Sequence, residues 1–484
     1  MTRKSWTHEG VCWVAGRKRT LPETIEVTDP ADGRVIGCVP RGGVELAREA
    51  VDTASEAFPA WSRRLPRERG QVLKDWANRI LDHRAELAKL LSQEQGKPVA
   101  EALGEVETAA EFVEWYGEEA KRISGEVLPP AKENQQMTVL RQPVGVAALI
   151  TPWNYPAAMV TRKAAPALAA GCTVVLKPAK ETPLIASALF ELLMETNLPH
   201  GAANLVTGDA ASIGDTWLGD YRVRKISFTG STGVGKELMK KAAEHVKRVS
   251  LELGGNAPAL VFEDADLDRA ADAIVANKFE NGGQMCNGIN LIFVQEPVRE
   301  ELTERILARV KALRVGRGTE TECHVGPLIN QRACHKVQAL VDDAVNKGAR
   351  LRYGGEPLLE GEYSNGHFYR PTVLTEVDDR MDLTRDEVFG PVAPILTFRI
   401  EEEAVRRANG TPYGLAAYLF TRDGGRIHRL TEGLEAGMVG VNGTSLSFPQ
   451  APFGGIKESG LGREGGLYGL EEFLELKFIS TMLD

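Results

Sequence analysis

One cysteine in this sequence occupies a setting that suits nucleophilic chemistry. Cys286 ends the segment 282–286 (GGQMC), and the two glycines permit a tight turn that leaves the sulfur accessible. Because the thiolate is the reactive form of cysteine, such a site would have to favour the anion. Taken alone, however, the segment fits a buried and inert cysteine better than a nucleophile, since free cysteines usually pack as small hydrophobes.

Two other polar residues occupy positions from which they could assist a nucleophile. Glu252 lies in the segment 251–256 (LELGGN), where apolar neighbours would raise its pKa toward the range of a general base. Asn154 follows a predicted strand at 144–150, and its amide N–H could stabilise a developing oxyanion. Each residue alone has a simpler interpretation. Glu252 fits an ion-paired glutamate at a strand end, and Asn154 fits an ordinary turn.

A glycine-rich segment could bind a phosphate group. Residues 228–235 (FTGSTGVG) follow a predicted strand at 225–228 and lead into a predicted helix at 236–249. Unpaired backbone N–H groups at such a helix start attract phosphate, and the glycines allow a close approach. Thr232 stands where the usual dinucleotide fingerprint has its second glycine, so an ordinary glycine-rich turn fits the pattern equally well.

The elements that must position these residues alternate between short apolar runs and helical patterns. Helices are predicted at 44–61 and 67–91, and Gly96 and Pro98 follow the second one. From residue 144 onward, predicted strands alternate with predicted helices; the strands are 144–150, 172–176, 204–207 and 225–228, and the helices include 157–170 and 182–196. This order predicts parallel βαβ units, whose ligands bind beyond the carboxyl ends of the strands.

The rest of the chain predicts a second α/β section and a projecting hairpin. Strands and helices alternate again from residue 257 to beyond residue 394. The polar, proline-containing segment 124–144 is typical of a hairpin, and the tail from Glu471 is strand-like. Either piece could pair at the edge of a second subunit.

The composition excludes several classes of protein. A length of 484 residues predicts two or three domains, and the net charge of −9 without a Lys/Arg block disfavours binding to nucleic acids or anionic membranes. No secretory signal and no apolar stretch long enough for a membrane span is visible. The lack of a signal and of a span predicts a cytoplasmic location, and six scattered cysteines without a CxxC pair then predict free thiols and no metal site.

Considered together, the motifs resemble the aldehyde dehydrogenase superfamily, with the succinate-semialdehyde dehydrogenases as the nearest subgroup. The matching motifs occur in family order from about residue 25 to the end; they are TPWNYP (151–156), LKPA (176–179), FTGSTGVG (228–235), LELGGN (251–256), GGQMC (282–286), EVFGPV (387–392) and PFGGIKESGLGREGG (452–466). Seven collinear motifs are a specific signal, whereas each one alone is weak.

The resemblance implies a role for each matching residue. Cys286 would attack the aldehyde carbon, Asn154 and the Cys286 backbone N–H would hold the oxyanion, and Glu252 would activate the water that hydrolyses a thioester. The positions that match dinucleotide contacts in the family are Trp153, Lys177, Gly230, Ser231, Leu253 and Glu387. None of the eight histidines lies in these motifs, which disfavours a Cys-His hydrolase.

Lys180 favours NADP over NAD as the cofactor, with use of both possible. Many NAD-preferring relatives carry a glutamate at this position, three residues after Lys177, and such a glutamate would bind the ribose hydroxyls and repel a 2′-phosphate. A lysine removes that repulsion and can pair with the phosphate. The alternative is that Lys180 points into solvent.

The substrate implied by the subgroup is a semialdehyde acid such as succinate semialdehyde. Arg162 matches one arginine of the subgroup and Ser447 matches a serine, so both are candidate substrate contacts. The second arginine of the subgroup is replaced by Glu280, which would repel a substrate carboxylate unless it were paired or protonated. A neutral hydroxyaldehyde or an aminoaldehyde is therefore the alternative substrate.

The resemblance also implies an α/β fold with a Rossmann-like cofactor domain, an α/β catalytic domain and a small bridging sheet. The expected cofactor domain comprises 1–123 and 143–253, the catalytic domain 254–446, and the bridging segments 124–142 and 447–484. Family members are homodimers or homotetramers. A CoA-acylating enzyme is disfavoured because Glu252 would activate water, and a non-catalytic binding protein is disfavoured by the joint presence of Cys286, Glu252 and Asn154.

Overall fold

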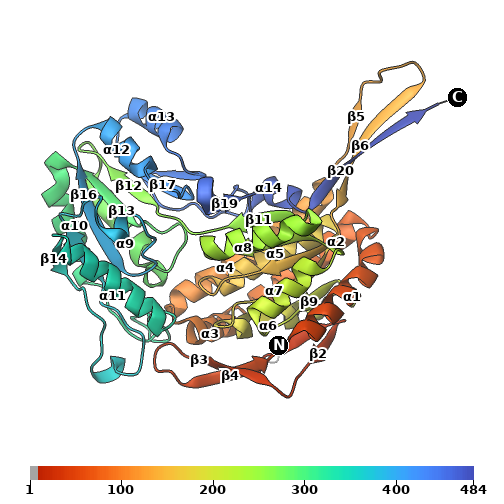
Figure 1. Ribbon diagram of the computed structural model, residues 1–484, viewed down its shortest axis with the longest axis horizontal. Helices are drawn as coiled ribbons and strands as arrows, with labels where there is room; N and C mark the ends of the chain where they lie inside the picture. The colour runs from red at the N-terminus through yellow and green to blue at the C-terminus, as the bar shows by residue number, and fades with distance from the viewer. Residues whose placement is uncertain (1–8, 484) are drawn as a thin grey trace.

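The computed structural model describes residues 9–483, which form two α/β bodies and a projecting three-stranded sheet (Figure 1). The first body is built on an eight-stranded sheet and the second on a seven-stranded sheet. A small two-stranded sheet, β3 (Thr24–Thr28) and β4 (Val35–Pro40), lies outside both. This arrangement confirms the α/β fold class that the sequence predicts.

The sheet of the first body has a parallel centre and antiparallel edges. In order across the sheet its strands are β19 (Gly460–Leu461), β11 (Arg248–Glu252), β10 (Val223–Thr229), β7 (Val146–Ile150), β8 (Thr173–Lys177), β9 (Ala203–Leu205), β1 (Cys12–Val14) and β2 (Arg17–Arg19). The strands from β11 to β9 are parallel, and β7 and β8 are apolar because helices cover both faces. The chain order reverses between β7 and β10, which creates a ligand crevice beyond their carboxyl ends.

Helices cover both faces of the first sheet. One face carries α1 (Val44–Ser62), α7 (Ala210–Gly219) and α8 (Thr232–Ala242). The other carries α5 (Pro156–Ala170) and α6 (Pro183–Met194), with α2 (Pro66–Asp82), α3 (Arg84–Gln95), α4 (Val99–Glu119) and α14 (Gly466–Glu471) packed against them. Among the described residues, no helix combines the length and apolar character that a membrane crossing requires.

Two predicted helices differ from the observed ones. The predicted helix 67–91 is two helices, α2 and α3, because the backbone leaves the helical conformation at His83. The predicted helix 236–249 was wrong at both ends. The observed helix, α8, begins at Thr232, directly after the glycine-rich turn, and ends at Ala242. Residues 248–252 do not continue it because they pair in parallel with β10 as strand β11.

The second body repeats the strand–helix alternation expected from residue 257 onward. In order across the sheet its strands are β14 (Arg350–Tyr353), β15 (Thr372–Thr375), β16 (Val392–Phe398), β13 (Leu291–Gln295), β12 (Pro258–Val261), β17 (Ala416–Phe420) and β18 (Met438–Val441). One face packs on α9 (Leu267–Phe279) and α10 (Arg299–Lys311). The other packs on α11 (Gln331–Asn346), α12 (Glu401–Asn409) and α13 (Gly424–Gly433).

Short 3₁₀ helices connect these elements in both bodies. They are η1 (Ala120–Arg122), η2 (Ala243–His245), η3 (Glu280–Gly283), η4 (Glu296–Val298), η5 (Gly361–Tyr363), η6 (Asp382–Thr384) and η7 (Lys457–Ser459). Of these, η3 leads directly toward Cys286.

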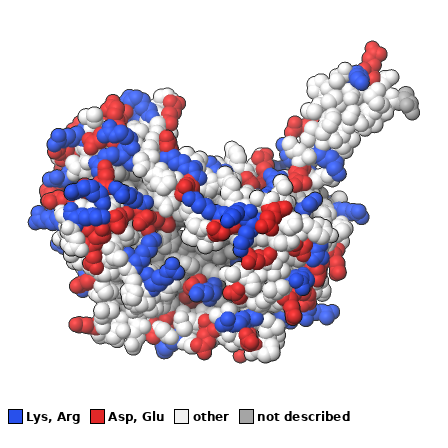
Figure 2. Space-filling view, viewed as in Figure 1, with Lys and Arg blue, Asp and Glu red and all other residues white. Residues whose placement is uncertain are grey.

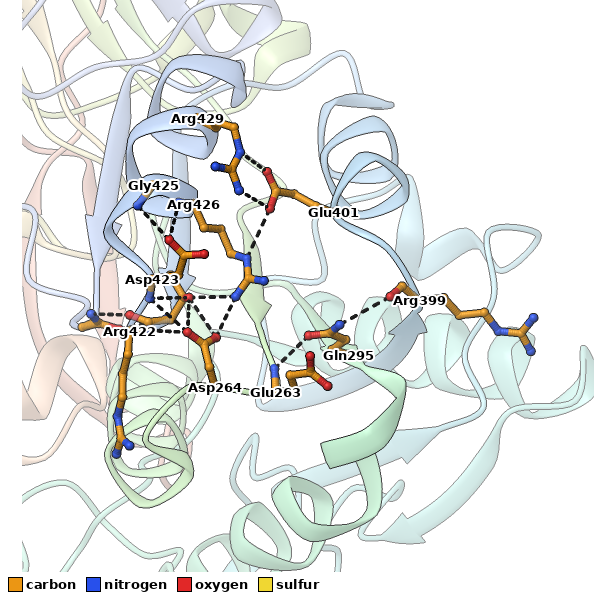
Figure 3. A network of polar contacts seen from close by, with 12 residues as sticks. Glu263, Asp264, Gln295, Arg399, Glu401, Arg422, Asp423, Gly425, Arg426 and Arg429 are labelled. Carbon is orange, nitrogen blue, oxygen red and sulfur yellow. Dashed lines mark hydrogen bonds and ion pairs between the residues drawn. The ribbon is translucent and has the colours of Figure 1, made fainter.

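A polar network fixes α12 and α13 at the carboxyl edge of the second sheet (Figure 3). Asp264, just beyond β12, accepts hydrogen bonds from the Thr421 hydroxyl at 2.8 Å and from the guanidinium of Arg426 at 2.8 Å. Arg426 also pairs with Glu401 at 3.2 Å. Because Cys286 precedes β13 at the amino edge of this sheet, the network stabilises the second body from the opposite edge.

The predicted hairpin at 124–144 and the strand-like tail are confirmed, and together they form the arm. It consists of β5 (Glu126–Leu128), β6 (Gln135–Pro143) and β20 (Leu474–Met482), with β20 antiparallel to β6 along nine residues. Lys and Arg lie among Asp and Glu over the two bodies on the face shown, whereas the arm carries few charges (Figure 2). Its exposed apolar side chains include Val127, Leu476, Phe478 and Met482.

Candidate active site

The candidate site lies where the carboxyl ends of the first sheet meet the amino end of the second. Asn154 follows β7, Glu252 is the last residue of β11, and Cys286 precedes β13. Cys286 lines two cavities of about 520 and 510 Å³, here called the Arg162 cavity and the Ser231 cavity after one lining residue of each. A ligand in either cavity can therefore reach the same sulfur.

The turn before Cys286 requires its glycines. Asn281, Gly282 and Gly283 all have left-handed backbone conformations, with φ of 52°, 63° and 75°. A Cβ on Gly283 would lie 2.2 Å from the carbonyl oxygen of Gly390, so a larger residue cannot fit there. The tight turn that the sequence predicts is thus confirmed, and Cys286 at its end is a partly exposed residue.

Cys286 and Glu252 are in direct contact. The Cys286 thiol donates a hydrogen bond to Glu252 Oε1 at 3.0 Å, and the Thr229 hydroxyl donates one to Oε2 at 3.0 Å. Burial and the neighbouring carboxylate raise the pKa of Cys286 well above its ordinary value. The sulfur is therefore a thiol in this arrangement, and Glu252 is placed to accept its proton.

A second carboxylate, Glu464, influences the pKa of Glu252. Burial raises the pKa of Glu252, and the charge of Glu464 raises it further, while Arg162 and Lys163 oppose the shift. Glu464 itself forms an ion pair with Lys163 and lies 3.2 Å from Arg162 Nε. Burial works to raise the pKa of Glu464, but these two cations outweigh it and hold that pKa below its ordinary value.

Asn154 is buried beside the cysteine turn. Its side-chain Nδ2 donates to the carbonyl oxygen of Gln284 at 3.1 Å, two residues before Cys286. One N–H of this carboxamide is used by that bond, and the second has no described partner, so it can serve a ligand oxygen. The structure thus brings Asn154, Glu252 and Cys286 together, as the sequence predicts.

The Arg162 cavity contains the three candidate substrate contacts. Arg162 is buried between the rings of Phe112 and Phe453, at 4.9 and 4.2 Å from their centroids, and its Nη1 lies 3.4 Å from the Ser447 hydroxyl. Among the described residues its Nη2 has no hydrogen-bond partner. Glu280 lies in the same cavity, so this space holds groups of both charges.

One part of the lining of the Arg162 cavity is acidic. Glu280 accepts a hydrogen bond from the Tyr155 hydroxyl at 2.8 Å. Glu101 accepts one from the Asn281 backbone N–H at 2.9 Å, and burial raises the pKa of Glu101 to about 8. The carboxyl groups of Glu101 and Glu280 both keep an oxygen that can accept a further hydrogen bond.

The Ser231 cavity contains five of the seven predicted cofactor contacts, which are Trp153, Gly230, Ser231, Leu253 and Glu387. Lys177 lies outside its lining; it is buried at the end of β8, where its Nζ donates to the Pro178 carbonyl at 3.0 Å. Lys180 also lies outside, with a side chain 72% exposed and 3.8 Å from Glu181. Glu181 itself lines the cavity.

The family model described as "Aldehyde dehydrogenase family" matches residues 13–479. This chain belongs to the aldehyde dehydrogenase family. It is 47% identical to the NADP-dependent succinate-semialdehyde dehydrogenase of Escherichia coli and 48% identical to a glutarate-semialdehyde dehydrogenase of Pseudomonas putida, covering 94% of both chains in each case. The crystal structure of a succinate-semialdehyde dehydrogenase from Burkholderia pseudomallei matches with a TM-score of 0.96 at 45% identity, covering 98% of both chains.

The residues of this dehydrogenase fit a dinucleotide in the Ser231 cavity. Ser231 precedes α8 without capping it through its side chain, which leaves first-turn N–H groups available to a phosphate. Glu387 Oε1 accepts from the Gly255 N–H at 3.2 Å, and burial raises the pKa of Glu387 to about 7. Its remaining acceptor capacity suits a ribose hydroxyl.

The dehydrogenase site also includes residues that sequence reasoning missed. Glu464 and Lys163 adjust the charge around Glu252, and Asn281 and Lys97 contact Asn154. Glu464 lies inside the motif 452–466, but the resemblance of that motif to the family implies no separate role for this glutamate. Lys97 stands in a helix-ending Gly-Lys-Pro that indicates only a turn, so its contact could not be predicted.

Proposed function

We propose that this NAD(P)-dependent aldehyde dehydrogenase oxidises a carboxylate-bearing semialdehyde, such as succinate semialdehyde, to the dicarboxylic acid. The observation that carries the proposal is the place of Cys286, at the junction of two cavities and 3.0 Å from Glu252. One cavity is suited to a substrate and the other to a dinucleotide. The names of the two semialdehyde dehydrogenases that share almost half of the sequence support the substrate class.

In the proposed acylation step, Cys286 is the nucleophile and Glu252 is the base. The thiol proton passes to Glu252 along the existing hydrogen bond while the sulfur forms a bond to the aldehyde carbon. The carbonyl oxygen becomes an oxyanion, which accepts the free N–H of the Asn154 carboxamide and the Cys286 backbone N–H. A nicotinamide bound in the Ser231 cavity would supply an acceptor for a hydride, so that the adduct on Cys286 would become a thioester.

In the proposed deacylation step, Glu252 acts a second time. It first releases the thiol proton to solvent and then accepts a proton from water as the water oxygen bonds to the thioester carbon. The carbon–sulfur bond breaks, the acid leaves, and Glu252 returns its proton to the departing thiolate. A pKa raised by burial and by Glu464 makes Glu252 a stronger base for both transfers.

Arg162 and Ser447 are the proposed contacts of the substrate carboxylate. Within residues 9–483, no hydrogen-bond partner is found for the buried Arg162 Nη2, and Arg162 Nη1 lies beside the Ser447 hydroxyl. A carboxylate that reached this corner would satisfy the free donor. The rings of Phe112 and Phe453 pack against the guanidinium of Arg162 and limit its movement, which favours a defined geometry for the bound acid.

A hydroxyaldehyde or an aminoaldehyde is a second candidate substrate, because the wall formed by Glu101, Tyr155 and Glu280 is acidic. Lys97, whose Nζ lies 3.8 Å from the centroid of the Tyr155 ring, already binds Glu105 at 2.6 Å and the Asn154 carbonyl at 2.8 Å. The hydrogen bonds of Lys97 thus go to other groups, although its charge lowers the pKa of Glu101. A hydroxyl or ammonium group on the substrate would find acceptors there.

We propose NADP as the preferred cofactor, with NAD also used. Lys180 is exposed and removes the repulsion that an acidic residue would exert on a 2′-phosphate. Its partner Glu181 offsets part of this effect, which supports the use of both cofactors.

The proposed domains are a cofactor domain (1–123 and 143–253), a catalytic domain (254–446) and bridging segments (124–142 and 447–484). The exposed apolar residues of the arm support a homodimer or homotetramer that forms through this sheet. All six cysteines are free, which supports a cytoplasmic location.

The test is an absorbance assay of nicotinamide reduction with the purified enzyme. Succinate semialdehyde, glycolaldehyde and an aminoaldehyde are compared, each with NADP and NAD and with or without CoA. We expect the highest kcat/KM for succinate semialdehyde without CoA, and no turnover with Cys286→Ala although dinucleotide still binds. A higher kcat/KM for the aminoaldehyde would contradict the semialdehyde assignment. A requirement for CoA would contradict hydrolysis of the thioester by water.

A further inference from the structure

Asn154 is enclosed by a group of buried side chains that no catalytic step uses. The group, called here the polar clamp, consists of Gln95, Lys97, Asn281 and Gln284. None of these residues is more than 2% exposed, and Asn154 itself is 4% exposed. They come from the α3–α4 turn and from the cysteine turn, far from Asn154 in sequence.

The backbone carbonyl of Asn154 accepts two hydrogen bonds from the clamp. Lys97 Nζ donates at 2.8 Å and Asn281 Nδ2 donates at 2.9 Å. A carbonyl oxygen has two lone pairs, so this oxygen is fully satisfied. The peptide group of Asn154 is thereby fixed from the first body by Lys97 and from the second body by Asn281.

Asn281 joins Asn154 to the cysteine turn. Its Nδ2 also donates to the Gln284 carbonyl at 3.2 Å, and that same carbonyl accepts the Asn154 carboxamide at 3.1 Å. The NH₂ group of Asn281 therefore donates to two carbonyl oxygens. One belongs to Asn154, and the other belongs to Gln284 and also accepts the hydrogen bond from the Asn154 side chain. This arrangement determines the direction of the remaining N–H of Asn154.

The clamp is itself held in place by further hydrogen bonds. Gln95 accepts from the Lys97 backbone N–H at 2.9 Å and donates to Asn281 Oδ1 at 2.8 Å. Glu105 pairs with Lys97 at 2.6 Å and accepts from the Ala157 N–H at 2.8 Å, in the first turn of α5. Because buried polar groups without partners cost free energy, this network strongly favours a single arrangement.

We propose that Asn281 and Lys97 are positioning residues that aim the Asn154 carboxamide at the oxyanion formed on Cys286. The inference rests on the proposed dehydrogenase mechanism and adds residues to it. Neither residue touches the reacting atoms, so both act through Asn154. Since a displacement of about 1 Å can cost on the order of a hundredfold in rate, loss of the clamp will slow acylation without weakening dinucleotide binding.

Asn281→Asp is the variant that tests this inference. It keeps the size of the side chain and a residue type that tolerates the left-handed φ of 52°, but it removes both donors. The matched control is Asn204→Asp. Asn204 is 0% exposed in β9 and donates to the carbonyls of Val174 and Gly201, with no contact to Asn154.

The readouts are the pre-steady-state rate of nicotinamide reduction, the Kd for NADP and the melting temperature. For Asn281→Asp we expect a reduction rate lowered by roughly tenfold to a hundredfold with an unchanged Kd. In an Asn154→Ala background the same substitution should add nothing, because the group through which it acts is already gone. Asn204→Asp should lower the melting temperature and leave the rate unchanged.

Each alternative result overturns the inference. The inference fails if Asn281→Asp reduces nicotinamide at the wild-type rate, or if it lowers the rate of the Asn154→Ala enzyme further. It also fails if Asn204→Asp lowers the rate as much as Asn281→Asp does. If the Asp variant does not fold, Asn281→Gly applies the same criteria, because glycine accepts the backbone conformation and also lacks the donors. Failure of the wild-type enzyme to reduce nicotinamide would instead contradict the proposed function.

Discussion

The Cys286 thiol and the Glu252 carboxylate are 3.0 Å apart although they belong to different bodies of the molecule. Glu252 ends a strand of the first sheet, and Cys286 precedes a strand of the second. The contact therefore exists only when the two bodies are docked. A Cβ on Gly255 would lie 2.8 Å from the Cys286 carbonyl oxygen, which shows how closely the two segments pack.

Glu252→Gln should separate the two halves of the reaction. A glutamine cannot accept a proton from water, so the thioester should form once and then persist. Acylation should be slowed as well, because the thiol loses its base. We expect one equivalent of reduced nicotinamide per Cys286 in stopped-flow absorbance, followed by almost no turnover. Steady turnover at the wild-type rate would contradict the assigned base.

Glu464→Gln should move the acid limb of the kcat profile to lower pH. Glu252 works only when ionised, and the Glu464 charge helps to raise its pKa beyond the effect of burial. Removing that charge leaves Lys163 and Arg162 to stabilise the ionised form of Glu252, so its pKa falls. The variant should also lose roughly 3–5 kcal/mol of stability, because a buried ion pair is broken.

The matched control for that variant is Glu472→Gln. Glu472 pairs with the buried Lys225 at 2.7 Å, so its loss also breaks a buried ion pair, but its charge is not among the main causes of the Glu252 shift. The control should lose stability while the pH profile stays in place. A shift of equal size in both variants would mean that general destabilisation, and not the charge of Glu464, moves the profile.

Lys180→Glu should change the cofactor preference toward NAD. A carboxylate at this exposed position would repel the 2′-phosphate of NADP and could bind the ribose hydroxyls of NAD. We expect the ratio of kcat/KM values for NADP and NAD to fall by about tenfold or more, equivalent to about 1.4 kcal/mol. Glu181→Gln should change the ratio in the opposite direction, and an unchanged ratio in both variants would remove Lys180 from cofactor selection.

Val246→Asn should stabilise the protein. Val246 has a left-handed backbone, with φ of 49°, and it is 90% exposed, so a β-branched residue is strained there without a packing benefit. Asparagine tolerates this conformation, and we expect a gain of about 1 kcal/mol in the free energy of unfolding. Val345→Asn, at an exposed helical position, should give no gain; a lower stability of Val246→Asn than of wild type would contradict the strain argument.

The fold was predictable where a local pattern matched the final environment. The apolar runs of β7 and β8 read as buried strands because helices cover both of their faces. The prediction of a helix over 236–249 was wrong because the helical pattern of this segment competes with strand pairing to β10. That pairing depends on tertiary structure. Helix boundaries set by distant strands cannot be read from a short window of sequence.

The site was predictable only where chemistry and motif coincide. Cys286, Glu252 and Asn154 stand in short segments that suit their roles, and the structure brings them together. The residues that act on them could not be predicted, because Glu464 is 212 positions from Glu252 in sequence and Asn281 is 127 positions from Asn154. Such partners are set by the docking of the two bodies, not by local pattern.

The most direct test of the central claim is to trap the thioester. The Glu252→Gln variant is mixed with succinate semialdehyde and NADP, quenched in acid, digested and analysed by mass spectrometry. We expect the peptide containing Cys286 to gain one succinyl group and the other five cysteines to stay unmodified. Acylation of another cysteine, or nicotinamide reduction by a Cys286→Ala enzyme, would contradict it.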